Sequence, residues 1–212
     1  MPTLPDVLAK LSFLTTTPAI VGLVITASLI VVIRDWRFSL TALLGQYVLV
    51  GLLLTRLIQP RVAVTKVLIG ALVCVVLYLT ARLVSDKGEG SPRGGASLAD
   101  FAFRLLAALL MGLAVYSLSK RYPLPEVPSD IGLACYWLAS LGLLVLMLTE
   151  EPLKAGMGLL TLVTGFELFY SALERSLSVA GFLGIANFLI ALAIAYLAAA
   201  SEAELAAGER ER

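Results

Sequence analysis

Two ionisable side chains lie deep inside apolar stretches of the sequence. Glu167 lies in the stretch 162–173, and Lys66 lies in the stretch 62–70. A charge at the centre of a bilayer costs about 2.5–3.5 kcal/mol on insertion scales, so we expect both side chains to face the protein interior. Desolvation favours the uncharged form of each group, which suits a residue that must accept and release a proton. Glu167 and Lys66 are therefore the first candidates for a proton or ion relay.

Both residues also allow a purely structural interpretation. Lys66 lies only about five residues from the start of its apolar stretch, so its long side chain could extend to the membrane surface. Glu167 lies about seven residues, or two helical turns, from the nearer end of its stretch, and its side chain is too short to cover that distance. It could instead form a structural hydrogen bond to a neighbouring helix. Whether Lys66 and Glu167 meet depends on helix packing, which the sequence leaves open.

Other polar residues lie near these two in the pattern. Glu167, Tyr170 and Glu174 fall at positions i, i+3 and i+7, so they share one helix face and could pass on a proton or an ion. Glu174 precedes Arg175 at the expected end of the helix, where a solvated loop charge is the simpler interpretation. Together with Tyr170, the amides of Gln46 and Asn187 are candidates for polar support. These amides could orient waters or, more simply, bond backbone carbonyls of neighbouring helices.

The composition identifies the kind of chain that must position these residues. Of its 212 residues, 59% are hydrophobic and only 15% are charged, and the mean hydropathy is +0.95. Soluble domains are usually about 45–50% apolar and about 25% charged. We therefore expect an all-α integral membrane protein, a polytopic bundle in contact with the lipid bilayer. The formal net charge of +1 provides no basic surface for nucleic acid, which we do not expect as a partner.

The residue types limit the chemistry further. The chain has no histidine, which excludes imidazole-ligated metals, His-ligated haem and every triad that needs an imidazole base. Cys74 and Cys135 both lie in apolar runs and are expected to be buried small hydrophobic residues. We expect no metal site, no cofactor and no catalytic residues, so the chain fits a non-catalytic subunit better than an enzyme.

Charges, prolines and glycines divide the sequence into membrane-spanning segments. A bilayer core of about 30 Å takes roughly 20 apolar residues of helix. Seven spans are predicted, at approximately 18–33, 38–58, 61–83, 99–119, 130–149, 153–174 and 178–200. Short connections predict tight antiparallel turns, and Pro60 and Pro152 suit the first turn of the helices that follow. Residues 1–16 have apolar residues at helical spacing and predict an interfacial helix.

The longer linkers 85–98 and 121–129 bracket the fourth span. The predicted organisation is therefore an N-terminal segment 1–16, a three-helix unit 17–84, a linker with the fourth helix 85–129, a second three-helix unit 130–200 and a polar tail 201–212. The two units share a spacing: Gln46 lies twenty positions before Lys66, and Glu167 lies twenty positions before Asn187. This favours a parallel repeat, although apolar helices also resemble each other by composition alone. If the repeat is real, we expect Lys66 and Glu167 to lie in separate bundles, linked only through waters or a partner subunit.

Lysine and arginine counts predict the orientation. The side with loops 34–37, 84–98 and 150–154 and the C-terminus carries nine of these residues, and the other side carries six. Positive charge favours the cytoplasmic side, so we expect a cytoplasmic C-terminus in a cell inner or plasma membrane.

The second half of the chain resembles a known family. It reads Gly-Leu-Leu-Val-Leu-Met-Leu-Thr from residue 142, Gly-Leu-Leu-Thr-Leu-Val-Thr-Gly-Phe-Glu from 158 and Ala-Asn-Phe-Leu-Ile from 186. This is similar to the three-helix K subunit of bacterial complex I and the C subunit of multi-subunit sodium/proton antiporters, where a Gly-Leu-Glu motif supplies a buried glutamate. Glu167 occupies that place. The second membrane glutamate of the family would fall near Asn187, so this chain departs from the two-glutamate pattern.

The whole chain resembles a longer family member. With Gly45-Gln46 in the second span and Thr65-Lys66-Val67-Leu68 in the third, it is similar to component E of hydrogenase-4 and formate-hydrogenlyase-type complexes. The resemblance implies a membrane-arm subunit of a complex-I-related redox complex, with other membrane subunits as partners and buried charges that transfer protons or sodium. Two further hypotheses are an autonomous secondary transporter, with Glu167 and Lys66 between two repeats, and a scaffold subunit in which Glu167 is structural.

Overall fold

The computed structural model describes residues 4–57, 60–87, 98–124, 127–173 and 177–210, and every regular element in these ranges is an α-helix. The helices are α1 (Leu4–Val32), α2 (Trp36–Leu57), α3 (Pro60–Lys87), α4 (Leu98–Arg121), α5 (Ser129–Leu148), α6 (Pro152–Leu173) and α7 (Leu177–Arg210). The predicted class, a polytopic helical bundle, is confirmed. The helices α3 and α6 begin at Pro60 and Pro152 as predicted, because the fixed φ of proline suits the first helical turn.

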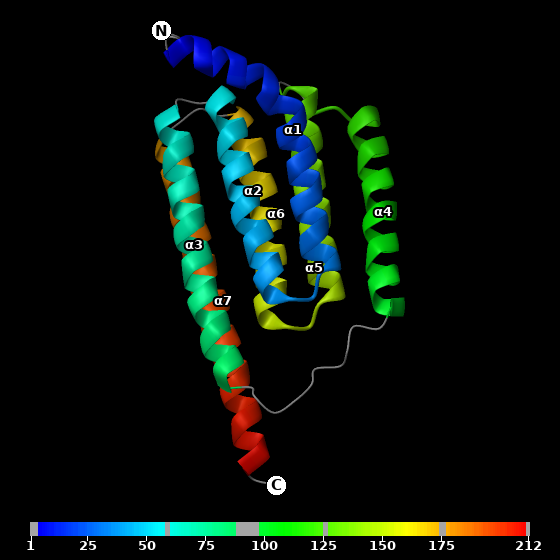
Figure 1. Ribbon diagram of the computed structural model, residues 1–212, viewed down its shortest axis with the longest axis vertical. Helices are drawn as coiled ribbons and strands as arrows, with labels where there is room; N and C mark the ends of the chain where they lie inside the picture. The colour runs from blue at the N-terminus through cyan, green and yellow to red at the C-terminus, as the bar shows by residue number, and fades with distance from the viewer. Residues whose placement is uncertain (1–3, 58–59, 88–97, 125–126, 174–176, 211–212) are drawn as a thin grey trace.

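The helices form two layers (Figure 1). The first layer contains α1, α2 and α3 side by side in chain order, and the second contains α5, α6 and α7 in the same order. Across the layers, α1 packs on α5, α2 on α6 and α3 on α7, and each of these pairs runs in the same direction. The remaining helix, α4, packs at the edge against α5 and α1. The two three-helix units are therefore stacked face to face.

This stacking defines how the two units are related. A twofold axis along the membrane normal would place α1 opposite α7 and α3 opposite α5, whereas each helix here lies opposite its counterpart. The two three-helix units are therefore related more nearly by a translation from one layer to the other than by a twofold rotation. The expectation that a repeat would leave Lys66 and Glu167 in separate bundles is wrong, because the two layers share one interior.

The two ends of the chain extend the predicted spans. Helix α1 runs without interruption from Leu4, includes Pro18, and changes direction between its N-terminal part and the part that packs in the bundle (Figure 1). A proline inside a helix removes a backbone hydrogen bond and produces such a bend. Helix α7 continues to Arg210 and projects beyond the bundle, so residues 201–210 of the predicted polar tail are helical.

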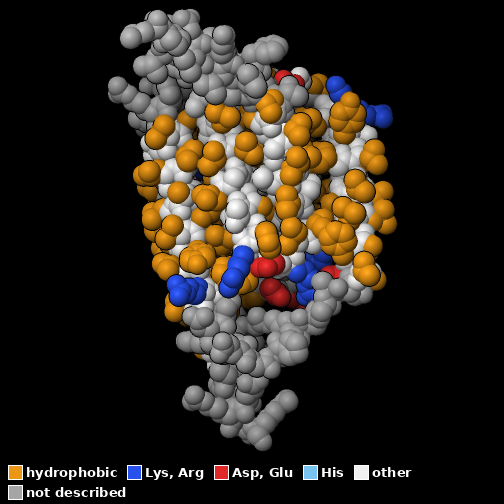
Figure 2. Space-filling view, in the orientation of Figure 1, with side chains coloured by type: hydrophobic (Ala, Val, Ile, Leu, Met, Phe, Trp, Pro, Cys, Tyr) orange, Lys and Arg blue, Asp and Glu red, His pale blue; other side chains and the backbone are white. Residues whose placement is uncertain are grey.

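The outer surface is that of a membrane protein. Helices α2 to α7 are each long and apolar enough to span a bilayer, and the apolar part described for α1 is Pro18–Val32. Figure 2 shows hydrophobic side chains along the flanks of the bundle, with Lys, Arg, Asp and Glu gathered at its ends. Cys74 and Cys135 are buried and unpaired, as predicted. The protein is therefore embedded in a membrane.

Candidate functional site

A direct ion pair joins Lys66 and Glu167 in the interior of the bundle. Nζ of Lys66 on α3 donates a hydrogen bond to Oε2 of Glu167 on α6. Only 8% of Lys66 and 3% of Glu167 is exposed. The prediction that both side chains face inward is confirmed, and Lys66 does not extend to the membrane surface. The tertiary structure thus joins the two deepest charges of the sequence.

Close helix packing determines where Glu167 lies. Helix α6 contacts α5 at glycines, because a Cβ atom on Gly142 would lie 2.5 Å from the backbone nitrogen of Leu162. A Cβ on Gly165, two residues before Glu167, would likewise lie 2.9 Å from the backbone nitrogen of Ala139. Real Cβ atoms do not come this close to backbone, so only glycine permits the contact. The backbone that carries Glu167 is therefore held rigidly against α5.

The ring of Tyr47 on α2 lies beside the ammonium group of Lys66. Nζ of Lys66 lies 5.9 Å from the centroid of the Tyr47 ring, within the range of a cation–π interaction. One turn beyond Lys66, Gly70 leaves room for this ring, because a Cβ there would lie 2.4 Å from Cγ of Tyr47. Residues from α2, α3 and α6 thus meet at one point of the interior.

Several polar atoms in the interior that holds the pair lack a protein partner. Nδ2 of Asn187 on α7 lies 3.4 Å from Oε2 of Glu167, a long hydrogen bond. Within the described residues, Oε1 of Glu167, Oδ1 of Asn187, the Tyr47 hydroxyl and both amide atoms of Gln46 are buried without a hydrogen-bond partner. The Tyr47 hydroxyl faces Thr164 and Asn187 but makes no hydrogen bond of normal geometry. The interior therefore retains hydrogen-bonding capacity beside the carboxylate, which a purely structural ion pair does not need.

The other predicted site residues occupy different places. Gln46 is completely buried on α2, and Asn187 contacts Glu167 through its side chain. Tyr170 is partly buried beside Phe166, with ring centroids 6.2 Å apart, and lines an open apolar hollow of about 410 Å³ with Phe182 of α7. Glu174 lies outside the described residues. The structure thus brings Lys66, Glu167 and Asn187 together and places Tyr170 at a separate hollow.

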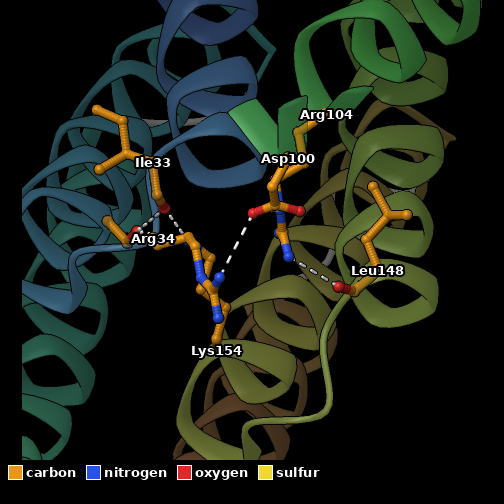
Figure 3. Close-up of polar contacts among 7 residues, drawn as sticks. Ile33, Arg34, Asp100, Arg104, Leu148 and Lys154 are labelled. Atoms are coloured by element: carbon orange, nitrogen blue, oxygen red, sulfur yellow. Dashed lines mark hydrogen bonds and ion pairs between the residues drawn. The ribbon is translucent and has the colours of Figure 1, made fainter. Parts of the chain in front are cut away.

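Sequence reasoning missed a second polar cluster, at the end of the bundle where α1 and α5 terminate (Figure 3). Lys154 was assigned to a loop, yet it is only 4% exposed and donates hydrogen bonds to the backbone oxygen of Ile33 and, at 3.1 Å, to Oγ of Ser39. Its position two residues after Pro152 was the available signal, because a proline in the first turn places residue 154 inside the helix.

Arg104 of α4 forms the other half of this cluster. Its guanidinium donates to the backbone oxygen of Leu148 at 3.1 Å and pairs with Asp100, which also lies 3.5 Å from Arg34 (Figure 3). Lys154 and Arg104 thus bind the last carbonyls of α1 and α5, where helix dipoles favour cations. The spacing of four residues between Asp100 and Arg104 was the available signal for their pairing, whereas the contact of Arg104 with α5 depends on tertiary packing.

The described residues contain no cluster of three or more His, Cys, Asp or Glu side chains that could hold a metal ion. The arrangement around Glu167 can perform proton chemistry with its own groups. An ammonium and a carboxylate in contact can exchange one proton, which converts a charged pair into a neutral amine and a neutral acid without a large movement of heavy atoms.

No model of a known protein family matches the chain, and neither the curated proteins nor the solved structures contain a match.

Proposed function

We propose that the chain is a membrane-embedded proton-transfer subunit in which Lys66 and Glu167 are the exchanging groups. The observation that carries this proposal is the direct contact of the two side chains in the interior of a membrane bundle. Truncating either partner of a buried ion pair leaves an uncompensated charge, and replacing both with apolar residues is often neutral or stabilising. A buried pair is therefore weak evidence for stability alone, whereas intramembrane ionisable residues commonly mark ion pathways.

The proposed transfer uses atoms that the site provides. A proton moves from Nζ of Lys66 to Oε2 of Glu167, which leaves a neutral amine and a neutral acid. Oε1 of Glu167 has no protein partner in the described part of the chain, so it can exchange a proton with a further donor or acceptor. Asn187 holds the carboxylate in place through its amide nitrogen. A proton that leaves the carboxyl group at Oε1 and one that enters at Nζ then restore the charged pair.

The assembly proposed for this subunit is the membrane arm of a complex-I-related redox complex, such as a membrane-bound hydrogenase. It is supported by the sequence resemblance to component E and to the K subunit, and by the coincidence of Glu167 with the glutamate of the K-subunit motif. The partners would be other membrane subunits. The proposed location is the cell inner or plasma membrane, with the C-terminus in the cytoplasm because the basic residues favour that side.

The test compares Glu167→Gln with a matched control in the intact complex. Glutamine retains size and hydrogen bonding but cannot carry the proton. We expect the complex still to assemble, with a lower free energy of unfolding because Lys66 loses its countercharge, and proton translocation in proteoliposomes to fall at least tenfold. Asp130→Asn changes an exposed carboxylate in the first turn of α5, at the opposite end of the bundle from Lys154, and should leave translocation unchanged. Full translocation by Glu167→Gln at unchanged stoichiometry would contradict the proposal and favour a scaffold.

Purification in mild detergent tests the proposed assembly separately. We expect the tagged chain to copurify with a stoichiometric set of redox and antiporter-like subunits, identified by mass spectrometry. Recovery of the chain alone, with proton-coupled transport after reconstitution, would favour an autonomous secondary transporter and contradict the subunit proposal.

A further inference from the structure

We infer that a buried row of polar side chains connects Lys154, at the end of the bundle, with the Lys66–Glu167 pair, and that protons enter along it. This inference rests on the proposed function. The row contains Lys154 and Ser39 at the bundle end, Gln46 and Thr161 at the middle level, and Thr164 next to the pair.

The environment of Lys154 provides the first argument. Its two hydrogen bonds, to the Ile33 carbonyl and to Ser39, use two of the three protons on Nζ. Within the described residues it forms no ion pair, and the charged groups that face it are Arg34, Asp35, Arg104 and Glu151. A cation that only caps a helix does not need burial, because an exposed lysine can bind the last carbonyls equally well. The burial of Lys154 therefore suggests a further role.

The register of α2 and α6 provides the second argument. These helices pack against each other and run in the same direction, and the Ser39–Lys154 contact fixes their relative height. Seven residues are almost two full helical turns, so Gln46 and Thr161 follow Ser39 and Lys154 on the same faces and at the same level. Both are completely or almost completely buried. Gln46 and Thr161 thus form a second polar level two turns further inside, where the Thr161 hydroxyl donates to the Met157 carbonyl and the Gln46 amide has no hydrogen-bond partner in the described residues.

The unpaired amide of Gln46 provides the third argument. Both Nε2 and Oε1 are buried without a hydrogen-bond partner in the described part of the chain, which lowers the free energy of unfolding. A buried polar group that stays unpaired in a native protein calls for an explanation, and a role in proton transfer provides one. Thr164 lies three residues beyond Thr161, is completely buried, and faces the Tyr47 hydroxyl near Glu167. From Lys154 to Glu167 the row covers thirteen residues of helix, or about 20 Å. The bundle end and the Gln46 level are about 10 Å apart, so we assign waters to bridge them. Hydroxyl groups and waters both donate and accept hydrogen bonds, so together they can pass a proton inward while Lys154 regains one from solution.

The decisive variant is Gln46→Met, because it should lower proton translocation without lowering the stability of the protein. Methionine fills the same volume and removes two unpaired polar atoms, so the melting temperature should stay equal or rise. Proton translocation by the intact complex in proteoliposomes should fall at least tenfold. Lys154→Met should lower translocation similarly. Thr161→Val should lower it several-fold, whereas Thr80→Val should not, although Thr80 and Thr161 both donate to the carbonyl four residues earlier.

The outcomes separate this inference from the proposed function. If Glu167→Gln stops translocation while Gln46→Met and Thr161→Val retain full rates, the entry row is wrong and the relay proposal stands. If Glu167→Gln translocates normally, the relay itself fails. Should Lys154→Met fail to assemble, the Gln46 and Thr161 variants still decide, because neither removes a charge or a helix cap.

Discussion

Lys66 on α3 and Glu167 on α6 are 101 positions apart in the chain and form a direct ion pair in the membrane interior. Neither residue lies in the helix layer of the other, so the pair connects the two three-helix units diagonally. The pair therefore links α3 and α6 directly across the interior.

A double-mutant cycle should show strong coupling between the two residues. Lys66→Met leaves a buried carboxylate without its countercharge, and Glu167→Gln leaves a buried ammonium, so each should destabilise the protein by about 3–5 kcal/mol. The double variant should lose much less than the sum. The measurement is denaturant-induced unfolding in detergent micelles, and additive losses would contradict a direct pair.

Glycine packing between α5 and α6 should be equally sensitive. A Cβ on Gly142 would lie 2.5–2.9 Å from the backbone of Leu162 and Gly158, which cannot move without separating the helices. We therefore expect Gly142→Ala to destabilise the protein by about 1–3 kcal/mol. Gly181→Ala is the control, because nothing lies within 4 Å of its Cβ and alanine favours the helix. Thermal unfolding of both variants in the same detergent is the measurement, and equal melting temperatures would argue against the packing.

Arg104 should hold α4 against the bundle. Replacement by Met removes the hydrogen bond to the Leu148 carbonyl and the pairing with Asp100, which we expect to cost about 1–3 kcal/mol. Arg121→Met, at the exposed end of the same helix, should have little effect. Thermal unfolding of both variants in the same detergent measures the difference, with a lower melting temperature expected only for the Arg104 variant.

The orientation can be measured by cysteine labelling in intact cells. Cysteine at exposed Tyr122, between α4 and α5, should react with an impermeant maleimide from outside. Cysteine at exposed Glu151, between α5 and α6, should react only after the cells are opened. Cys74 and Cys135 should stay silent because both are buried. Reaction of both new sites from the same side would contradict the spanning of α5.

The helical spans and their starts could be predicted from sequence because they depend on local properties. Twenty consecutive apolar residues must form a helix in lipid, where every backbone polar group needs an internal partner. Pro60 and Pro152 marked helix starts for an equally local reason. Local reasoning also predicted a helix within residues 1–16, but it did not predict that this helix is continuous with the first span or that α7 continues to Arg210.

For the candidate site, the sequence alone determined that Glu167 faces inward, since its side chain is too short to reach the membrane surface from its depth in its span. For Lys66 the sequence left open an extension to the surface, and the tertiary structure decided that it is buried. Only the tertiary structure decided that the two residues meet, because apolar helices carry little information about which neighbour each will contact. The same holds for Lys154, whose burial arises from the contact of α6 with α1 and α2. The depth of a residue in the membrane depends on its position in one helix, whereas the side chain that it contacts depends on how the helices pack.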